Sequence, residues 1–406
     1  MTQVLKKILK KFNKSAKQGE PYEKWGDNWH SPEKPIAFMF GFNPWKRDYI
    51  SQVFKDYRTA FVYGSAGLNR LKHFFPKGKN FVFIVWSYKE ETEIVNYAES
   101  HNIKIIRVED GFIRSVGLGS NHTIPMSVVA DKSGLYFNAK KSSDLEQILS
   151  TYDFENNPGL ITEARNCMDK IIQEGISKYN NVIEKDVEAV YGEKGIKKRI
   201  LVIGQVEDDA SIKYGLNKKM TNNELVLHAF NENPDAEIFY KPHPDVLIDN
   251  REKKSDPTLV AHIANIVEEP LSLNDSLKTI DHVYTMTSLS GFEALIRGIK
   301  VTCFGMPFYA GWGLTDDRQT CERRTRQLTL EELFAGAYLL YPMYINPITG
   351  KEESAENIID YLIDVKKAIA KKNEEKSFNH VLFQKEIEID SLGVDSKIEL
   401  KISMKQ

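Results

Sequence analysis

The sequence predicts an α/β protein of two doubly wound, Rossmann-like halves that face a common cleft. Short apolar runs of strand length alternate with longer amphipathic segments in two separate series. Such alternation is typical of parallel sheets whose faces are covered by helices. A charged stretch without a strand run, residues 141–194, separates the two series. The length of 406 residues also suits two domains, because single cores rarely grow beyond about 250–300 residues.

The first series predicts an N-terminal domain over residues 34–195. Its apolar runs, interpreted as buried parallel strands, cover 36–42, 59–64, 81–86 and 103–111. Segments with helical period lie between them at 44–56 and 89–101. The charged stretch ends in GEKGIKKR, where we place the domain junction.

The second series predicts a C-terminal domain over residues 196–350. Its strand runs cover 200–205, 236–244, 282–288 and 300–305, and helices fit at 220–231 and 291–297. Ligands of open parallel sheets bind beyond the carboxyl ends of the strands. The unusual polar clusters of this chain follow such runs, so we expect them to face one cleft.

The first 33 residues form a cationic leader, in which residues 4–17 have the pattern of an amphipathic interfacial helix. Its apolar face carries Val4, Leu5, Ile8, Leu9 and Phe12. Its lysines are Lys6, Lys7, Lys10, Lys11, Lys14 and Lys17. Anionic lipid headgroups attract such a helix by about 1 kcal/mol per lysine. The segment is expected to bind the anionic inner-membrane surface, and a solvated helix docked on its own protein is the alternative.

Residues 351–406 are predicted to form a C-terminal extension with a charged helix over 355–373 and a hairpin over 378–404. The hairpin has two open interpretations, covering a sheet edge or joining protomers. No apolar run of about 18 residues and no signal-peptide core are found. We therefore expect a cytoplasmic protein whose membrane contact is peripheral.

Composition narrows the classes of partner. The formal net charge is −2 and no long basic face is evident, so a nucleic-acid partner is not expected. The cysteines Cys167, Cys303 and Cys321 lie far apart without a CxxC motif, which argues against a zinc site and against a disulfide framework.

Two acidic clusters follow strand runs. Glu109 and Asp110 come directly after the run that ends in IIRV, where one of them could take a proton from a hydroxyl. Turn formation by Asp-Gly is the structural alternative. Asp208 and Asp209 stand in GQVEDDAS after the first strand of the second half. They could supply one acid to a reaction centre, or they could form the acidic first turn of a helix.

Three further clusters have the composition of a ligand site. In KPHP two prolines hold His243 in an extended loop beside Lys241, a pair suited to a phosphate. In TSLSGFEAL, Ser288 and Ser290 open a helix whose first turn could bind phosphate, and Glu293 could accept ribose hydroxyls. An ordinary N-capped helix is the alternative there. The aromatic, glycine-rich loop 305–315 could wrap a base or a sugar.

In this order, the motifs EDGFIRS, GQVEDDAS, KPHP, TSLSGFEAL and GMPFYAGWGLT resemble the KpsC-type β-Kdo transferases of Gram-negative capsule assembly. The resemblance covers roughly residues 36–350. It implies a GT-B fold with an N-terminal acceptor domain and a C-terminal donor domain, the donor CMP-Kdo, and retention of configuration. It also implies a lipid-linked or growing glycan as acceptor.

The resemblance implies roles for the clusters. His243, Ser288, Ser290 and Glu293 would hold the CMP moiety, with help from Lys241. Asp209 fits the Gln-x-x-x-Asp spacing of the nucleophile, which starts at Gln205 on the donor side, and Asp208 is its rival. Glu109 or Asp110 would be the acid/base that activates the acceptor. Arg114 would pair with the Kdo carboxylate.

Some expectations stay open. The chain holds a single copy of the module, which predicts one kind of linkage. A sialyltransferase-like enzyme with another CMP-sugar and a noncatalytic capsule assembly or export factor are the rival functions. No spaced DxD follows a strand, so no metal or other cofactor is expected.

Overall fold

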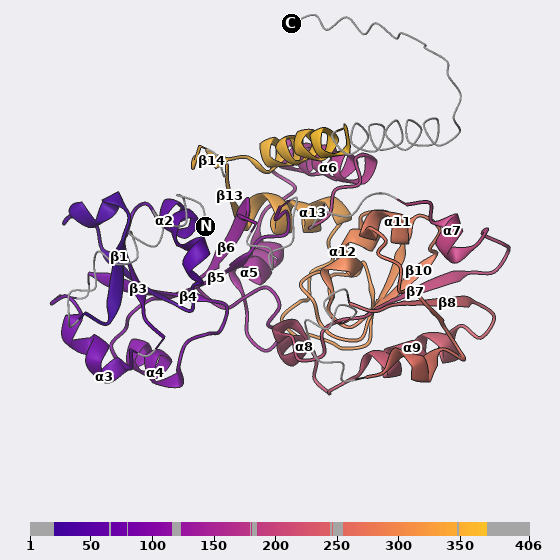
Figure 1. The fold of residues 1–406 in the computed structure, drawn as a ribbon, viewed down its shortest axis with the longest axis horizontal. Helices are drawn as coiled ribbons and strands as arrows, with labels where there is room; N and C mark the ends of the chain where they lie inside the picture. Colours follow the sequence, from indigo (N-terminus) through magenta and orange to yellow (C-terminus); the bar gives the residue numbers. More distant parts are fainter. Residues whose placement is uncertain are drawn as a thin grey trace, which may run out of the picture.

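A computed structural model of the chain describes residues 20–64, 66–78, 80–115, 123–178, 180, 185–243, 246, 255–346 and 349–371. The predicted leader helix over 4–17 and the hairpin over 378–404 lie outside these residues. Two lobes lie side by side (Figure 1). The N-terminal lobe is built on a mixed sheet and the C-terminal lobe on a parallel sheet. In the described ranges, no helix combines the length and apolar composition that crossing a membrane requires.

The N-terminal lobe contains an eight-stranded sheet of order β1-β3-β2-β4-β5-β6-β13-β14. Its strands are β1 Tyr22–Trp25, β2 Ile36–Phe40, β3 Arg58–Val62, β4 Phe81–Trp86, β5 Ile105–Asp110, β6 Ser127–Asp131, β13 Pro342–Ile345 and β14 Glu352–Glu353. The helices of this lobe are η1 Asp27–His30, η2 Pro44–Lys46, α2 Arg47–Val53, α3 Leu68–Leu71, η3 Lys72–Phe74 and α4 Thr92–Ser100. The four predicted strand runs correspond to β2, β3, β4 and β5, which are parallel.

Alternate side chains of this sheet face helices on opposite sides. Met39 of β2 packs in the cluster that contains Ile50 of α2, whereas its neighbour Phe38 packs with Ile94 of α4. Since successive side chains of a strand point to opposite faces, a strand that is apolar at every position must be covered twice. This is why the runs read as continuous apolar segments.

The C-terminal lobe contains a six-stranded parallel sheet of order β12-β11-β10-β7-β8-β9. Its strands are β7 Arg199–Ile203, β8 Glu237–Lys241, β9 Asn265–Ile266, β10 His282–Thr285, β11 Lys300–Cys303 and β12 Asp316–Asp317. Its helices are α8 Ala210–Gly215, α9 Asn222–Glu232, η5 Pro257–Val260, α11 Leu273–Leu277 and α12 Leu289–Leu295. Leu201 and Val202 of β7 again face opposite clusters, one with Phe292 of α12 and one with Leu225 of α9. The second predicted series of strands and helices is thus found as a parallel sheet covered on both faces.

The charged stretch 141–194 contains helices and no strand among its described residues, as expected. They are α5 Asp144–Thr151, α6 Pro158–Gln173 and α7 Glu188–Tyr191. A helix over 355–371 lies beside α6 in Figure 1, where Lys170 of α6 contacts Glu356 and Asp360. The predicted C-terminal helix is therefore present and packs on the connector between the lobes.

The sheet of the N-terminal lobe extends beyond the predicted domain bounds of 34–195. β1 lies before residue 34, and β13 returns from the end of the chain to pair antiparallel with β6. Helix α13 Leu330–Phe334 and the π-helical segment η6 Ala335–Leu340 lead into β13. Strands β13 and β14, which the predicted bounds assign to the C-terminal domain and the extension, thus pair in the first sheet. A four-residue strand whose partner lies about two hundred residues away leaves no local pattern, because its pairing depends on the tertiary fold.

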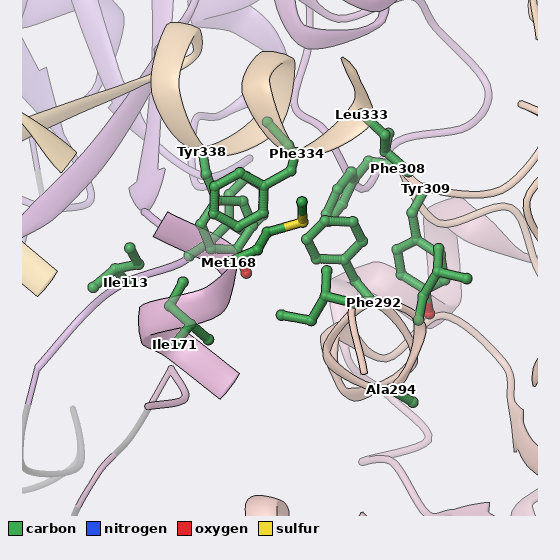
Figure 2. Packing of buried hydrophobic residues seen from close by; sticks show 14 of the residues in the cluster. Ile113, Met168, Ile171, Phe292, Ala294, Phe308, Tyr309, Leu333, Phe334 and Tyr338 are labelled. Atoms are coloured by element: carbon green, nitrogen blue, oxygen red, sulfur yellow. The ribbon is translucent and has the colours of Figure 1, made fainter. Parts of the chain in front are cut away.

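One aromatic cluster joins the lobes (Figure 2). Phe112, just after β5, lies 4.7 Å from Phe308 of the C-terminal lobe and stacks on Tyr338 of η6 at 5.2 Å, measured between ring centroids. Tyr338 also stacks on Phe292 of α12. Each fully buried phenylalanine contributes roughly 1.5–3 kcal/mol. The lobes therefore share one core, and their relative position is set by side-chain packing.

A buried ion cluster lies at the same boundary. Glu146 of α5 is 4% exposed and accepts hydrogen bonds from Arg323 at 2.6 Å and Arg324 at 3.0 Å. Arg324 also donates to the carbonyls of Pro307 and Ala310, which fixes the loop 305–315. Burial alone would raise the pKa of Glu146, but the two guanidinium groups hold it below its usual value.

Replacing Glu146 with Gln should destabilise the protein by about 3 kcal/mol, because it leaves a buried arginine without its counter-charge. Urea unfolding at neutral pH measures the loss. Since the folded-state pKa is lowered, this stabilisation is complete above the ordinary glutamate pKa and is lost as the pH falls below it. Glu331→Gln, which removes an exposed pair with Arg165, is the control and should cost less than about 1 kcal/mol. Equal losses of stability in both variants would contradict a stabilising role of the buried ion cluster at Glu146.

Candidate functional site

The turn after β7 is held tightly against the KPHP segment. The Gly204 amide donates to the carbonyl of Lys241 at 2.8 Å, and a Cβ at Gly204 would lie 2.9 Å from Cα of Pro242. A larger residue would therefore push the two segments apart. The two motifs are neighbours because β7 and β8 are adjacent parallel strands.

Gln205 connects this turn to the TSLSGFEAL motif. Its side-chain oxygen accepts from the Thr287 amide at 2.8 Å, and its Nε2 donates to the Thr287 hydroxyl at 3.1 Å. Its backbone exchanges two hydrogen bonds with the Asn222 side chain. The buried amide of Gln205 thus positions two loops, and the donor contact expected of it stays a prediction.

Asp209 and Asp208 are both exposed, so either carboxylate is accessible to a ligand. Asp209 is the N-cap of α8 and its carboxylate accepts from the Ser211 amide at 2.8 Å. The helix-cap interpretation is therefore observed, and it does not prevent a second role. The preceding acid, Glu207, instead accepts from the amide of Asn222 and the hydroxyl of Ser255.

Helix α8 also contacts the N-terminal lobe. The Tyr214 ring lies 4.8 Å from the ring of Tyr88, which follows β4, and the Lys140 ammonium donates to the carbonyl of Lys213. The helix that begins at Asp209 is thus fixed at its other end by the opposite lobe.

Lys241 and His243 follow β8. The Lys241 ammonium donates to the carbonyl of Leu271 at 3.1 Å, and burial lowers its pKa to about 8. His243 is half-buried, and its carbonyl accepts from the amide of Val246. Pro244, the second proline of the motif, lies outside the described residues.

The TSLSGFEAL motif runs from the end of β10 into α12. Ser288 is the N-cap of α12 and its hydroxyl oxygen accepts from the Ser290 amide at 3.2 Å. Glu293 is 4% exposed; one carboxylate oxygen accepts from the Lys178 amide at 3.1 Å, and the other has no hydrogen-bond partner among the described residues. Burial raises the pKa of Glu293 to about 7 against the opposing effect of Arg297.

At the end of β5, the surroundings move the pKa values of the adjacent acids Glu109 and Asp110 in opposite directions. Asp110 bonds to the Lys46 ammonium at 3.0 Å and to Nε of Arg114 at 2.8 Å. Burial favours its protonation, but these cations hold the pKa of Asp110 below its usual value. Burial and the Asp110 charge instead raise the pKa of Glu109. Asp110 is therefore the carboxylate that carries the two ion pairs, and the choice of Glu109 or Asp110 as the acid/base stays a prediction.

Arg114 is fully buried, with contacts to Asp110 and to the Ser115 hydroxyl. Its expected pairing with a donor carboxylate stays a prediction, and in this structure it positions Asp110. Lys46, which the sequence did not single out, lies 3.4 Å from the centre of the Trp86 ring. Its contact with Asp110 spans 64 residues, so no local pattern indicates it.

Tyr136 lies within electrostatic reach of acids from both lobes. Burial raises the pKa of its hydroxyl, the charge of Lys178 opposes this rise, and the charges of Glu109, Asp110 and Asp209 add to it. Acids of both lobes thus act on the hydroxyl of one half-buried tyrosine. Neither Tyr136 nor Lys178 stands in a motif, and sequence reasoning missed both.

Within the described residues, no group of three or more His, Cys, Asp or Glu side chains is arranged as a metal site. A groove of 950 Å³ lies at the outer edge of the second sheet, along β9. Its lining includes Lys185, Tyr191, Phe239 and Glu269, and none of the motif residues described above.

Residues 83–352 match the family described as capsule polysaccharide biosynthesis protein. LpsZ, a lipopolysaccharide-processing protein of Rhizobium meliloti, is 45% identical over 342 residues, which cover 84% of this chain and 77% of LpsZ. LipA, a capsule polysaccharide modification protein of Neisseria meningitidis, is 41% identical over 328 residues, which cover 80% of this chain and 45% of LipA. The chain thus matches less than half of the length of LipA.

Two solved structures of KpsC from Thermosulfurimonas dismutans are similar to the chain. The β Kdo 2,4 transferase has a TM-score of 0.69 at 34% identity, covering 82% of this chain and 99% of that one. The β Kdo 2,7 transferase has a TM-score of 0.66 at 36% identity, with the same coverage. The chain belongs to the capsule polysaccharide biosynthesis protein family and, within it, to the KpsC type. The resemblance inferred from the motifs is confirmed.

Replacing Glu293 with Gln tests the burial of its carboxyl group. Because the folded-state pKa is raised to about 7, the stability that protonation supports is full below the ordinary glutamate pKa and is lost as the pH rises through about 7. Between about pH 5 and pH 8, the wild type should lose roughly 2 kcal/mol more than the variant. Urea unfolding at both pH values measures this, with Glu322→Gln at an exposed position as control. The same pH dependence in wild type and Glu293→Gln would show that the carboxyl ionises without cost.

Proposed function

We propose that the chain is a GT-B glycosyltransferase that moves Kdo from CMP-Kdo, with retention, to a capsule or related surface glycan. The observation that carries this proposal is the similarity of the chain, at 34% and 36% identity over 82% of its length, to two KpsC transferase structures. Both of those structures are β Kdo transferases, and the chain shares their family, which supports Kdo as the transferred sugar. In this proposal CMP binds the C-terminal lobe and the acceptor approaches the N-terminal lobe.

In the first step, the Asp209 carboxylate attacks C2 of Kdo. The bond from C2 to the phosphate oxygen breaks, and CMP leaves with the electron pair. His243, Lys241, Ser288 and Ser290 would bind the phosphate, so the scheme requires no metal ion. The product is a covalent Kdo ester of Asp209.

In the second step, an acceptor hydroxyl attacks C2 from the face that CMP has left. Glu109 takes the hydroxyl proton, the bond between C2 and Asp209 breaks, and the carboxylate is regenerated. Two inversions give net retention. Glu109 suits this role because its pKa is raised, whereas Asp110 is held ionised by its cations.

The acceptor, the cytoplasmic location and the contact of residues 4–17 with anionic lipid remain part of the proposal. The cationic leader predicted from the sequence would place the enzyme where a lipid-linked acceptor is found.

Incubation of the full chain with CMP-Kdo followed by intact-protein mass spectrometry tests the nucleophile. The wild type should gain one Kdo-sized adduct that maps to Asp209, and Asp209→Asn should form none and slow transfer by roughly a thousandfold or more. Asp208→Asn is the matched control and should keep the adduct. An adduct that persists in Asp209→Asn but disappears in Asp208→Asn would reverse the assignment. The same assay with other CMP-sugars tests the sialyltransferase-like alternative.

Glu109→Gln separates the two steps. The variant should still form the Kdo adduct, while transfer to a synthetic acceptor should slow by about 10²–10⁴-fold because no base accepts the proton. In the wild type, transfer should fall as the pH drops through the raised pKa of Glu109, since protonation removes the base. Rapid-quench measurements of both steps check this, with the exposed Glu99→Gln as control. Loss of adduct formation at an unchanged transfer step would contradict the role.

A further inference from the structure

A chain of three hydrogen-bonded side chains links the turn after β7 to the helix that begins at Asp209. Nε2 of Gln205 donates to the Thr287 hydroxyl at 3.1 Å, and that hydroxyl donates to Oγ of Ser211 at 3.2 Å. Gln205 and Thr287 are both buried. Ser211, the second residue of α8, is half-buried, so the chain of hydrogen bonds runs from the interior towards the surface.

The backbone amide of Thr287 fixes the order of donors in this chain. A backbone amide can only donate, and this one lies 2.8 Å from the side-chain oxygen of Gln205. The nitrogen of Gln205 therefore points to the Thr287 hydroxyl, which accepts from it and directs its own proton to Oγ of Ser211. The Ser211 oxygen thus acts as an acceptor within the protein, and its own proton points elsewhere.

Ser211 is also joined to the proposed nucleophile. Its backbone amide donates to one oxygen of the Asp209 carboxylate at 2.8 Å. Among the residues that the structure describes, no acceptor for the Ser211 hydroxyl proton is found. A hydroxyl donor held from the interior by Gln205 and Thr287 is therefore placed beside the carboxylate that attacks the sugar in the proposed mechanism.

We infer that the Ser211 hydroxyl donates a hydrogen bond to the carboxylate of the acidic sugar that is transferred. The inference rests on the proposed function, in which Asp209 attacks the carbon that carries this carboxylate. Two carboxylates must then come close together, and like charges at short distance repel. A hydroxyl proton beside the nucleophile offsets this repulsion, orients the sugar and disfavours donors without a carboxylate.

The test compares binding of CMP and CMP-Kdo by calorimetry in the full chain that carries Asp209→Asn, so that no turnover occurs. The asparagine oxygen can still accept from the Ser211 amide. Adding Ser211→Ala should weaken CMP-Kdo binding about tenfold and leave CMP binding unchanged, because CMP lacks the carboxylate. Ser211→Thr keeps the hydroxyl and should restore most of the affinity.

Ser255→Ala is the matched control. Ser255 is half-buried in the same lobe, and its hydroxyl donates to the carboxylate of Glu207 at 2.6 Å, so its proton is used within the protein. The control should bind CMP and CMP-Kdo as the Asp209→Asn parent does. A tenfold loss in this control as well would show that the assay responds to any serine hydroxyl near the turn, and it would overturn the inference.

The methyl ester of CMP-Kdo identifies the group that accepts the hydrogen bond. Its carboxyl group carries no charge, and hydrogen bonds to neutral acceptors are weaker, so Ser211→Ala should weaken its binding by about threefold or less. A tenfold loss with the ester as well would place the hydroxyl on another part of the sugar.

Two further outcomes would overturn the inference. Equal weakening of CMP and CMP-Kdo would place the effect of Ser211→Ala on the nucleotide or in the fold, and unchanged binding of both would remove Ser211 from the site. Failure of the proposed function differs from these outcomes. In that case the Asp209→Asn parent binds CMP-Kdo no better than CMP, and the wild type forms no Kdo adduct. Unchanged CMP binding also shows that the Ser211→Ala protein is folded.

Discussion

The contact of Phe112 with Phe308 and Tyr338 is the interaction on which the site depends. Phe112 stands two residues after Asp110, and Phe308 lies in the loop after β11 of the other lobe. Burying these rings in one core therefore sets where the acids of the N-terminal lobe stand relative to the motifs of the C-terminal lobe. The Glu146 ion cluster and the return of β13 to the first sheet reinforce this arrangement. Such packing resists continuous deformation, as a catalytic constellation built from two lobes requires.

The burial that joins the lobes also gives similar carboxyl groups different properties. Asp110 and Glu109 are adjacent in the chain, but two cations hold Asp110 ionised while Glu109 is protonated more readily. Glu293 is buried with one partner amide and also holds its proton more tightly than an exposed glutamate. Environments that move neighbouring pKa values apart are how enzymes assign acid and base roles. The proposed division of labour follows from this separation.

The elements that are encoded in short stretches of sequence could be predicted. The apolar run 81–86 coincides with β4, and the motif that contains Asp209 both caps a helix and lies at the lobe junction. The pairing of β13 with β6 was not predictable, because a four-residue strand has no signature of its distant partner. Lys46 and Lys178 were missed for the same reason: each acts on the acids through a tertiary contact, without a motif of its own. The choice between Glu109 and Asp110 likewise required knowing which cations surround them.

A crystal structure of the full chain with CMP bound tests the central claim, that the donor lies between the motifs of the two lobes, most directly. The account predicts CMP on the C-terminal lobe, with its ribose at Glu293 and its phosphate near His243 and Asp209. CMP bound instead in the groove lined by Tyr191 and Phe239, at the outer edge of the second sheet, would contradict it.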